Sequence, residues 1–163
     1  GTPGRTPRPA GLASHPVEGE EADTCVRVAV RARPLVAKER MTGARMCVTA
    51  DAANSCVRLG NARTFTFDHV FGPTSSQDEI YAQCVKPLLE DCFMGYNTTV
   101  LAYGQTGSGK TYTMGTGDNA PVLPDELGII PRVIRELFHG IEERREQTEC
   151  YVQCQFLEVY NET

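Results

Sequence analysis

The stretch Gly104-Gln105-Thr106-Gly107-Ser108-Gly109-Lys110-Thr111 fits the pattern G-x-x-x-x-G-K-[ST], and it constrains this chain more than any other feature does. Loops of this kind bind phosphate because successive backbone N–H groups converge on the anion. Gly104, Gly107 and Gly109 carry no Cβ atom that would block its approach. The pattern therefore predicts a site for a nucleoside triphosphate. The alternatives are a flexible glycine turn and a loop that has lost its ligand.

The last two residues of the loop have separate expected roles. Lys110 would bring a compact positive charge to the β- and γ-phosphates, and the Thr111 hydroxyl would bind the Mg²⁺ ion that bridges them. The preceding run, Thr98-Thr99-Val100-Leu101-Ala102-Tyr103, is short, apolar and partly β-branched, which is typical of a covered central strand. Strand, glycine loop and helix start would then follow in the order that a phosphate loop requires.

Length and composition suit one soluble domain. The chain has 163 residues, of which 40% are hydrophobic, and no apolar run reaches membrane-spanning length. Its net charge of −5 argues against a dominant nucleic-acid-binding surface. The first residues lack the apolar core of a secretory signal, and the chain begins at Gly1 rather than Met, so we expect a fragment of an intracellular protein.

The cysteines are odd in number and form no C-x-x-C pair. We therefore expect reduced thiols that act as small hydrophobic residues, rather than a disulfide framework or a zinc site. The seven are Cys25, Cys47, Cys56, Cys84, Cys92, Cys150 and Cys154.

The N-terminal part of the chain divides into a leader and a run of strands. Residues 1–23 are rich in Pro, Gly and charge without apolar periodicity, and we expect them to be disordered, with an ordered domain over 24–163. In residues 25–31 valines alternate with other residues, as a strand demands. Residues 46–49 and 55–59 suggest an antiparallel pair, and residues 64–68 a further strand.

Two helices are expected in the second half of the chain. Ser76-Gln77-Asp78-Glu79 has the form of a capping box, and an apolar stripe at helical spacing follows as far as Phe93. Pro87 should disturb this helix locally, and Gly95 should end it.

The later helix begins near Gly128-Ile129-Ile130-Pro131, after an exposed loop over residues 115–127. Its expected apolar face comprises Ile130, Val133, Ile134, Leu137, Phe138 and Ile141, and its expected solvent-facing charges are Arg132, Arg135, Glu136 and Glu142. Residues 150–160 read as a last strand. Strands that alternate with helices around a phosphate loop predict a three-layer α/β domain with a central sheet.

Several separated stretches together resemble the kinesin motor domain. They include Val28-Ala29-Val30-Arg31-Ala32-Arg33-Pro34, Phe65-Thr66-Phe67-Asp68-His69-Val70-Phe71 and the run from Gly95-Tyr96-Asn97 through the loop to Tyr112-Thr113-Met114-Gly115. Gly128-Ile129-Ile130-Pro131-Arg132 and Phe156-Leu157-Glu158-Val159-Tyr160-Asn161-Glu162 are similar to later landmarks of that domain. The resemblance runs from about residue 25 to the end and is strongest to the chromokinesin-type subgroup. It implies a P-loop NTPase fold of kinesin motor type, with a central mixed sheet flanked by helices and truncated in its C-terminal half.

The resemblance also implies an adenine side for the site. Arg31, Arg33 and Pro34 match the family's Arg-x-Arg-Pro motif, and Tyr112 matches the aromatic position that packs on the base. Pro34 and Tyr112 offer flat apolar surfaces, while the arginines can stack or donate hydrogen bonds. The alternatives are ordinary core packing for Tyr112 and a solvated strand end for the arginines.

The function implied is a microtubule motor driven by hydrolysis of ATP with Mg²⁺, located on the cytoskeleton in the cytoplasm. The family's Asn-x-x-Ser-Ser-Arg-Ser-His and Asp-Leu-Ala-Gly-x-Glu stretches, which organise the attacking water and the metal, do not occur in this sequence. No catalytic residue is therefore assigned, and we expect little ATPase activity from this chain alone. A truncated module that only binds nucleotide or a partner, and another P-loop enzyme such as a small-molecule kinase, are the competing hypotheses.

Overall fold

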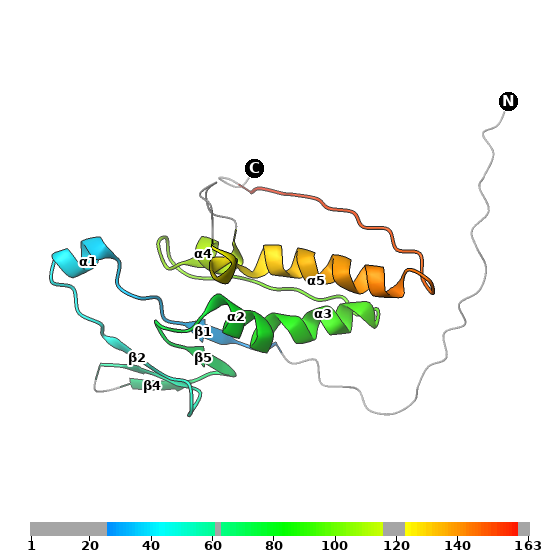
Figure 1. The fold of residues 1–163 in the computed structure, drawn as a ribbon. Coiled ribbons are helices and arrows are strands. Elements are labelled where there is room, and N and C mark those ends of the chain that lie inside the picture. Colours follow the sequence, from blue (N-terminus) through cyan, green and yellow to red (C-terminus); the bar gives the residue numbers. More distant parts are fainter. Residues whose placement is uncertain (1–25, 61–62, 116–122, 160–163) are drawn as a thin grey trace.

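The computed structural model describes residues 26–60, 63–115 and 123–159 (Figure 1). The expected disordered leader and the residues Cys25 and Tyr160 lie outside these ranges. The elements in chain order are β1 (Ala29–Arg31), α1 (Ala37–Met41), β2 (Val48–Asp51), β3 (Cys56–Leu59), β4 (Arg63–Thr66), β5 (His69–Phe71), α2 (Gln77–Ile80), the π-helical turn η1 (Tyr81–Val85), α3 (Lys86–Phe93), α4 (Lys110–Met114), the 3₁₀ turn η2 (Pro124–Glu126) and α5 (Ile129–Arg144).

Strands β1 and β5 form a two-stranded parallel sheet in which Val30 lies opposite Val70. Val70 and Phe71 are buried, so this pair carries part of the core. The alternating valines predict a longer strand than is observed, because only Ala29–Arg31 joins the ladder. The main chain of Val28 is held instead by Asp68, whose carboxylate accepts from the Val28 N–H at 2.7 Å.

The expected antiparallel pair is confirmed as part of a three-stranded sheet in the order β2–β3–β4. Ala50 lies opposite Val57, and Val57 lies opposite Phe65. Cys56 and Val57 are buried, so Cys56 does act as a small hydrophobic residue. Cys47, by contrast, is exposed.

The helical stretch over residues 77–93 follows its expected start, stripe and end. The Ser76 hydroxyl accepts from the Glu79 N–H at 3.1 Å, and Gly95 follows the helix with φ +96°. The disturbance expected at Pro87 takes the form of the π turn η1, in which the Lys86 N–H bonds to the Tyr81 carbonyl. The buried members of the stripe are Ile80, Tyr81, Val85 and Leu89.

Helix α5 lies beside α3, and its start lies close in space to the end of α4 (Figure 1). Ile129 at its start packs with Tyr81 and Val85, and Met114 of α4 joins this cluster. A Cβ on Gly128 would lie 2.3 Å from the Gly115 nitrogen, so two glycines allow the end of α4 and the start of α5 to touch.

The expected division of α5 into apolar and charged faces is only partly right. Ile134 and Phe138 are half exposed. Arg132 does not point into solvent, since its guanidinium donates to the Leu127 carbonyl at 2.8 Å and to Asp78 at 2.7 Å. Glu136 accepts from the Tyr81 hydroxyl and pairs with Lys86.

Two expected strands do not form in this structure. Residues 98–103 have no ladder partner among the described residues, and Leu101 and Tyr103 are 84% and 95% exposed. Residues 150–159 are likewise extended without a ladder, and Phe156 is 91% exposed. A strand needs a neighbouring strand to bond its N–H and C=O groups. The described part of the chain provides no such neighbour for either segment.

Across the described ranges, no helix is long and apolar enough to cross a membrane.

Candidate nucleotide-binding site

The phosphate loop adopts a conformation that only glycine accommodates easily. Gly104 has φ +152°, and a Cβ atom there would lie 2.5 Å from the Ser108 Oγ. Gly109, which immediately precedes helix α4, has φ +100°. The Ser108 N–H donates to the Gln105 carbonyl at 3.1 Å and closes the turn between them. Both glycines are therefore required by the backbone path of the loop.

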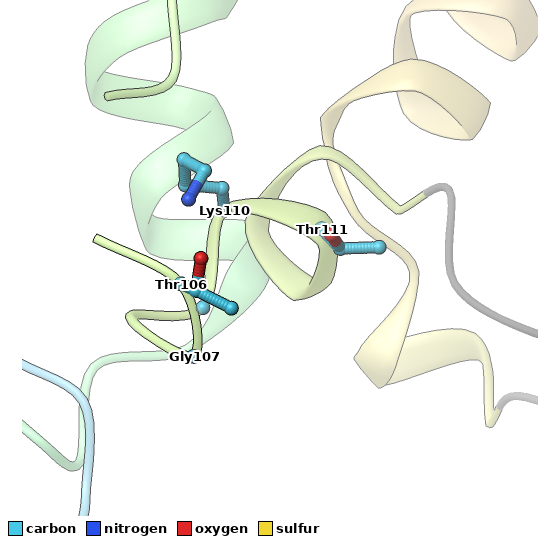
Figure 2. Close-up of a pocket in the computed structure, with 5 residues that line it drawn as sticks. Thr106, Gly107, Lys110 and Thr111 are labelled. Carbon is cyan, nitrogen blue, oxygen red and sulfur yellow. The ribbon is translucent and has the colours of Figure 1, made fainter. Parts of the chain in front are cut away.

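This loop surrounds an open hollow of about 280 Å³ lined by Thr106, Gly107, Gly109, Lys110 and Thr111 (Figure 2). All five belong to the eight-residue pattern, so the structure brings the main part of the predicted phosphate site together. Gln105 and Ser108 shape the turn and do not line the hollow.

Lys110 is the first residue of α4 and folds back over the loop. Its Nζ donates to the Gly104 carbonyl at 2.7 Å and to the Gln105 carbonyl at 3.0 Å. Both acceptors are neutral carbonyls, and among the described residues no carboxylate forms an ion pair with Lys110. A phosphate anion in the hollow would be a stronger partner for the ammonium group than either carbonyl.

Thr111 also lines the hollow, but in Figure 2 its side chain points away from Lys110. The two residues expected to share the triphosphate and its metal therefore do not converge here. Within the described residues, no group of three or more His, Cys, Asp or Glu side chains could hold a metal ion. The oxygen chemistry of the Thr111 hydroxyl fits Mg²⁺ as a single ligand beside phosphate oxygens.

Arg31 ends β1 and points into the protein rather than into solvent. Its Nη1 donates to Gln77 Oε1 at 2.7 Å and to Thr113 Oγ1 at 3.0 Å, and its Nη2 reaches the Ser75 carbonyl at 3.4 Å. Burial lowers the pKa of this guanidinium from its ordinary value, and the nearby Tyr112 partly offsets the effect. The solvated strand end considered for Arg31 is therefore wrong.

Arg33 joins helix α1 to the phosphate loop. Its Nε donates to the Gly107 carbonyl at 2.8 Å, and its Nη2 pairs with Glu39 at 2.5 Å. The hydrogen bonds from Arg33 and from the Val36 N–H lower the pKa of the Glu39 carboxyl to about 2. Arg33 thus meets the loop itself and is not a free strand-end charge.

Tyr112 and Pro34 both lie at the surface. The Tyr112 side chain is 52% exposed, which rules out the alternative of ordinary core packing. The Arg31 guanidinium lies 5.1 Å from the centre of the ring. Pro34 is exposed, with its carbonyl accepting from Arg33.

Sequence reasoning missed two residues that hold the arginines. The capping-box pattern predicts a helix start at Gln77 and no contact with Arg31, and no sequence pattern discussed above assigns a role to Glu39. The position of Glu39 three residues after Val36, at the start of a short helix, was the available signal, since a glutamate there can accept from the main chain at the helix start. No comparable signal marked Gln77.

A second hollow, of about 520 Å³, is bordered in the described part of the chain by Gln153, Cys154 and Gln155. These three consecutive residues lie in the exposed extended segment, so this hollow is open surface rather than a built site.

Comparison with known proteins agrees with the geometry of the loop. The family model for the kinesin motor domain matches residues 31–163. The chain belongs to the kinesin motor domain family. Kinesin-like protein KIF21B of Mus musculus is 49% identical over 150 residues, which cover 87% of this chain and 9% of that protein. Kinesin-like protein KIF27 of Homo sapiens is 49% identical over 137 residues, which cover 84% of this chain and 10% of that protein.

Solved kinesin structures show that the fold is shared. The Drosophila kinesin family member Kin10/NOD, in complex with manganese and ADP, has a TM-score of 0.66 and 35% identity, over 77% of this chain and 41% of that one. The same motor in complex with AMPPNP has a TM-score of 0.65. The kinesin chain therefore has the expected α/β motor fold and spans about a tenth of the curated relatives and two fifths of the solved motor. The chromokinesin-type subgroup stays a prediction.

Proposed function

We propose that this chain is the ATP-binding part of a motor that couples ATP hydrolysis to movement along microtubules. The observation that carries the proposal is the hollow at the phosphate loop, in a chain whose family is that of kinesin motors. Residues 24–163 would be the N-terminal part of the motor domain. The NOD complexes with ADP and AMPPNP support a nucleotide as the ligand.

Each residue of the proposed site has a physical task. The loop from Gly104 to Gly109 would hold the phosphates through backbone N–H groups, and Lys110 would neutralise their charge after leaving its carbonyl partners. The Thr111 hydroxyl would turn toward the phosphates and serve as one ligand of Mg²⁺, which supplies charge neutralisation when bound.

The base would lie against Tyr112 and Pro34, outside the loop. Arg31 already lies against the ring and would act by fixing its orientation. Arg33 would hold the loop through the Gly107 carbonyl and leave the face of Pro34 open. These base-side assignments rest on the exposure of both rings in the described structure.

Microtubules are the proposed partner and the cytoskeleton in the cytoplasm the proposed location. NOD has been docked with tubulin in a map of its microtubule complex, which supports this partner for a motor of the same fold. The net charge of −5 makes nucleic acid a poor candidate for this segment.

A second candidate function is nucleotide binding without hydrolysis. Among the described residues, those that line the hollow are Thr106, Gly107, Gly109, Lys110 and Thr111, and none of these carries a carboxylate that could act as a general base or orient a water. We therefore propose that the activity of the motor requires groups beyond those that line this hollow.

The test is titration calorimetry of Mg·ATP into the purified chain. Lys110→Ala removes the proposed phosphate cation, while Lys38→Ala removes an exposed lysine of α1 and serves as the matched control. We expect binding by the wild type and Lys38→Ala and its loss in Lys110→Ala, with circular dichroism to show that all three are folded. Equal affinity in Lys110→Ala would exclude this lysine from the site. A folded wild type without affinity would reject the proposal for this chain.

A further inference from the structure

Gln77 is the one buried polar residue among the residues that the structure describes, with 4% of its surface exposed. It begins helix α2, directly after Ser76 caps that helix. Both N–H groups and the carbonyl oxygen of its side-chain amide have hydrogen-bond partners. Oε1 accepts from Arg31 at 2.7 Å, and Nε2 donates to the carbonyls of Tyr112 at 2.7 Å and Glu126 at 3.2 Å.

These bonds join segments that are distant in sequence. Arg31 ends β1, Tyr112 lies in the middle of α4, and Glu126 ends the turn η2. The capping bond from Glu79 to Ser76 fixes the start of α2, so Gln77 is held on a rigid element. A buried amide whose groups are all satisfied specifies one geometry, because any displacement leaves a polar group without a partner.

These bonds, together with the contact of Arg31 with the tyrosine ring, form a closed network that includes Tyr112. Gln77 holds the Tyr112 main chain, and Arg31, itself held by Gln77, contacts the Tyr112 ring and the hydroxyl of Thr113. The Gln77 amide thus acts on the backbone of Tyr112 directly and on its aromatic ring through Arg31. Helix α4 begins at Lys110. The same network of contacts therefore sets how the base side is placed relative to the phosphate loop.

We propose that Gln77 is a positioning residue that orients Tyr112 and Arg31 for the base of the bound nucleotide. It acts through these two residues and does not touch the hollow, whose lining does not include it. This inference rests on the proposed nucleotide-binding function and adds to it a residue that carries none of the phosphate contacts.

The inference separates base binding from phosphate binding. Gln77→Met keeps the length of the side chain and removes all three hydrogen bonds. ATP affinity should then fall roughly tenfold, the equivalent of one lost hydrogen bond to a charged group. Affinity for magnesium tripolyphosphate, which has no base, should change less than about twofold, since Lys110 and the loop remain. Gln83→Met, an exposed glutamine of the same helical stretch, is the matched control and should change neither affinity.

Hydrogen exchange on the free chain tests the same linkage without a ligand. The N–H groups of Thr113 and Gly115 bond to the carbonyls of Gly109 and Thr111, in the helical turns of α4 and its two capping residues. Their exchange should speed up roughly tenfold in Gln77→Met and stay unchanged in Gln83→Met, whereas the amides of β3 should be unaffected in both.

A double-mutant cycle with Arg31→Met shows whether Gln77 acts through Arg31. We expect Gln77→Met to weaken ATP binding much less in the Arg31→Met background than in the wild type. Additive effects, equal losses for ATP and tripolyphosphate, or unchanged exchange in α4 would each overturn the inference. A wild type that binds neither ligand overturns the proposed function and the base-side role together. If the wild type binds both ligands and Gln77→Met leaves the ratio of the ATP and tripolyphosphate affinities unchanged, only the role of Gln77 is overturned.

Gln77→Glu replaces the first variant if Gln77→Met does not fold. It keeps an acceptor for Arg31 and loses both donors to Tyr112 and Glu126. Exchange in α4 should therefore speed up, while the ratio of ATP to tripolyphosphate affinity should shift less than in Arg31→Met, which removes the guanidinium itself. Unchanged exchange in Gln77→Glu would overturn the inference.

Discussion

The Nε of Arg33 donates to the main-chain carbonyl of Gly107 at 2.8 Å, although the two residues are 74 positions apart in the chain. The rest of the guanidinium is engaged by Glu39 and by the Pro34 carbonyl. One arginine thus ties the short helix α1 to the phosphate loop, and Glu39 fixes its direction.

The pH dependence of this link follows from the lowered pKa of Glu39. A carboxyl whose pKa falls from 4.5 to about 2 on folding stabilises the folded state above pH 4.5, and this contribution is lost as the pH falls through 2. We expect the carboxyl carbon of Glu39 to titrate near pH 2 by NMR, and at a higher pH in Arg33→Met, where the bond from the Val36 N–H still lowers the pKa but the Arg33 bonds are gone. Arg40→Met, which removes an exposed arginine of the same helix, should leave the midpoint unchanged. A midpoint near 4.5 in the wild type would mean that the pair does not form in solution.

The Tyr112 ring can be tested directly as a surface for the base. Tyr112→Ala should weaken ATP binding by about 1 kcal/mol, roughly fivefold, because the stacking surface is lost. Magnesium tripolyphosphate should bind to the variant as it does to the wild type. Tyr103→Ala removes a more exposed ring beside the loop and should leave both affinities within twofold. Calorimetric titrations measure both, and an undiminished ATP affinity in Tyr112→Ala would remove the ring from the site.

The hydroxyl of Tyr81 donates to Glu136 and joins the π turn to α5. Burial, with the bond to Glu136, raises the pKa of this phenol above its ordinary value, so the group stays protonated at neutral pH. Tyr81→Phe should lower the free energy of unfolding by about 1.5 to 3 kcal/mol, as expected for a hydrogen bond to a charged acceptor. Tyr151→Phe removes an exposed bond of the same kind, to Glu149, and should cost less than about 0.5 kcal/mol. Urea unfolding would compare the two variants. Equal losses in the free energy of unfolding would contradict the structural role of Tyr81.

Gly128 should tolerate no side chain. Its backbone angles, φ −78° and ψ −166°, suit any residue, but a Cβ would lie 2.3 Å from the main chain of Gly115. Gly128→Ala should therefore destabilise the chain by about 1 to 3 kcal/mol through overpacking that no side-chain movement relieves. At Gly72 an added Cβ would lie 3.9 Å from its nearest neighbour, so Gly72→Ala is the control and should be close to neutral. A difference below 0.5 kcal/mol in thermal unfolding would show that α4 and α5 do not meet as closely as described.

Local patterns predicted the elements whose hydrogen bonds are satisfied nearby. The pair β2 and β3 and the capped helix at Ser76 lie where expected, because turn residues, alternation and capping act within a few residues. The same reasoning predicted strands over 98–103 and 150–160, but neither 98–103 nor the described residues 150–159 join a ladder. Their apolar residues are suited to a covered sheet, but a strand exists only with its neighbours, and the described chain supplies none for them.

The sequence by itself determined the phosphate loop, because its glycines and Lys110 act through backbone conformation and charge at fixed spacing along the chain. It also determined the family, through motifs that stand in a fixed order. Only the tertiary structure decided how Arg31 and Arg33 are held. Arg31 turned inward to Gln77, and Arg33 turned to Glu39 and Gly107, because each guanidinium found acceptors on elements far away in sequence. No local pattern encodes such a partner, since it depends on which helix ends the fold places within about 3 Å of the charge.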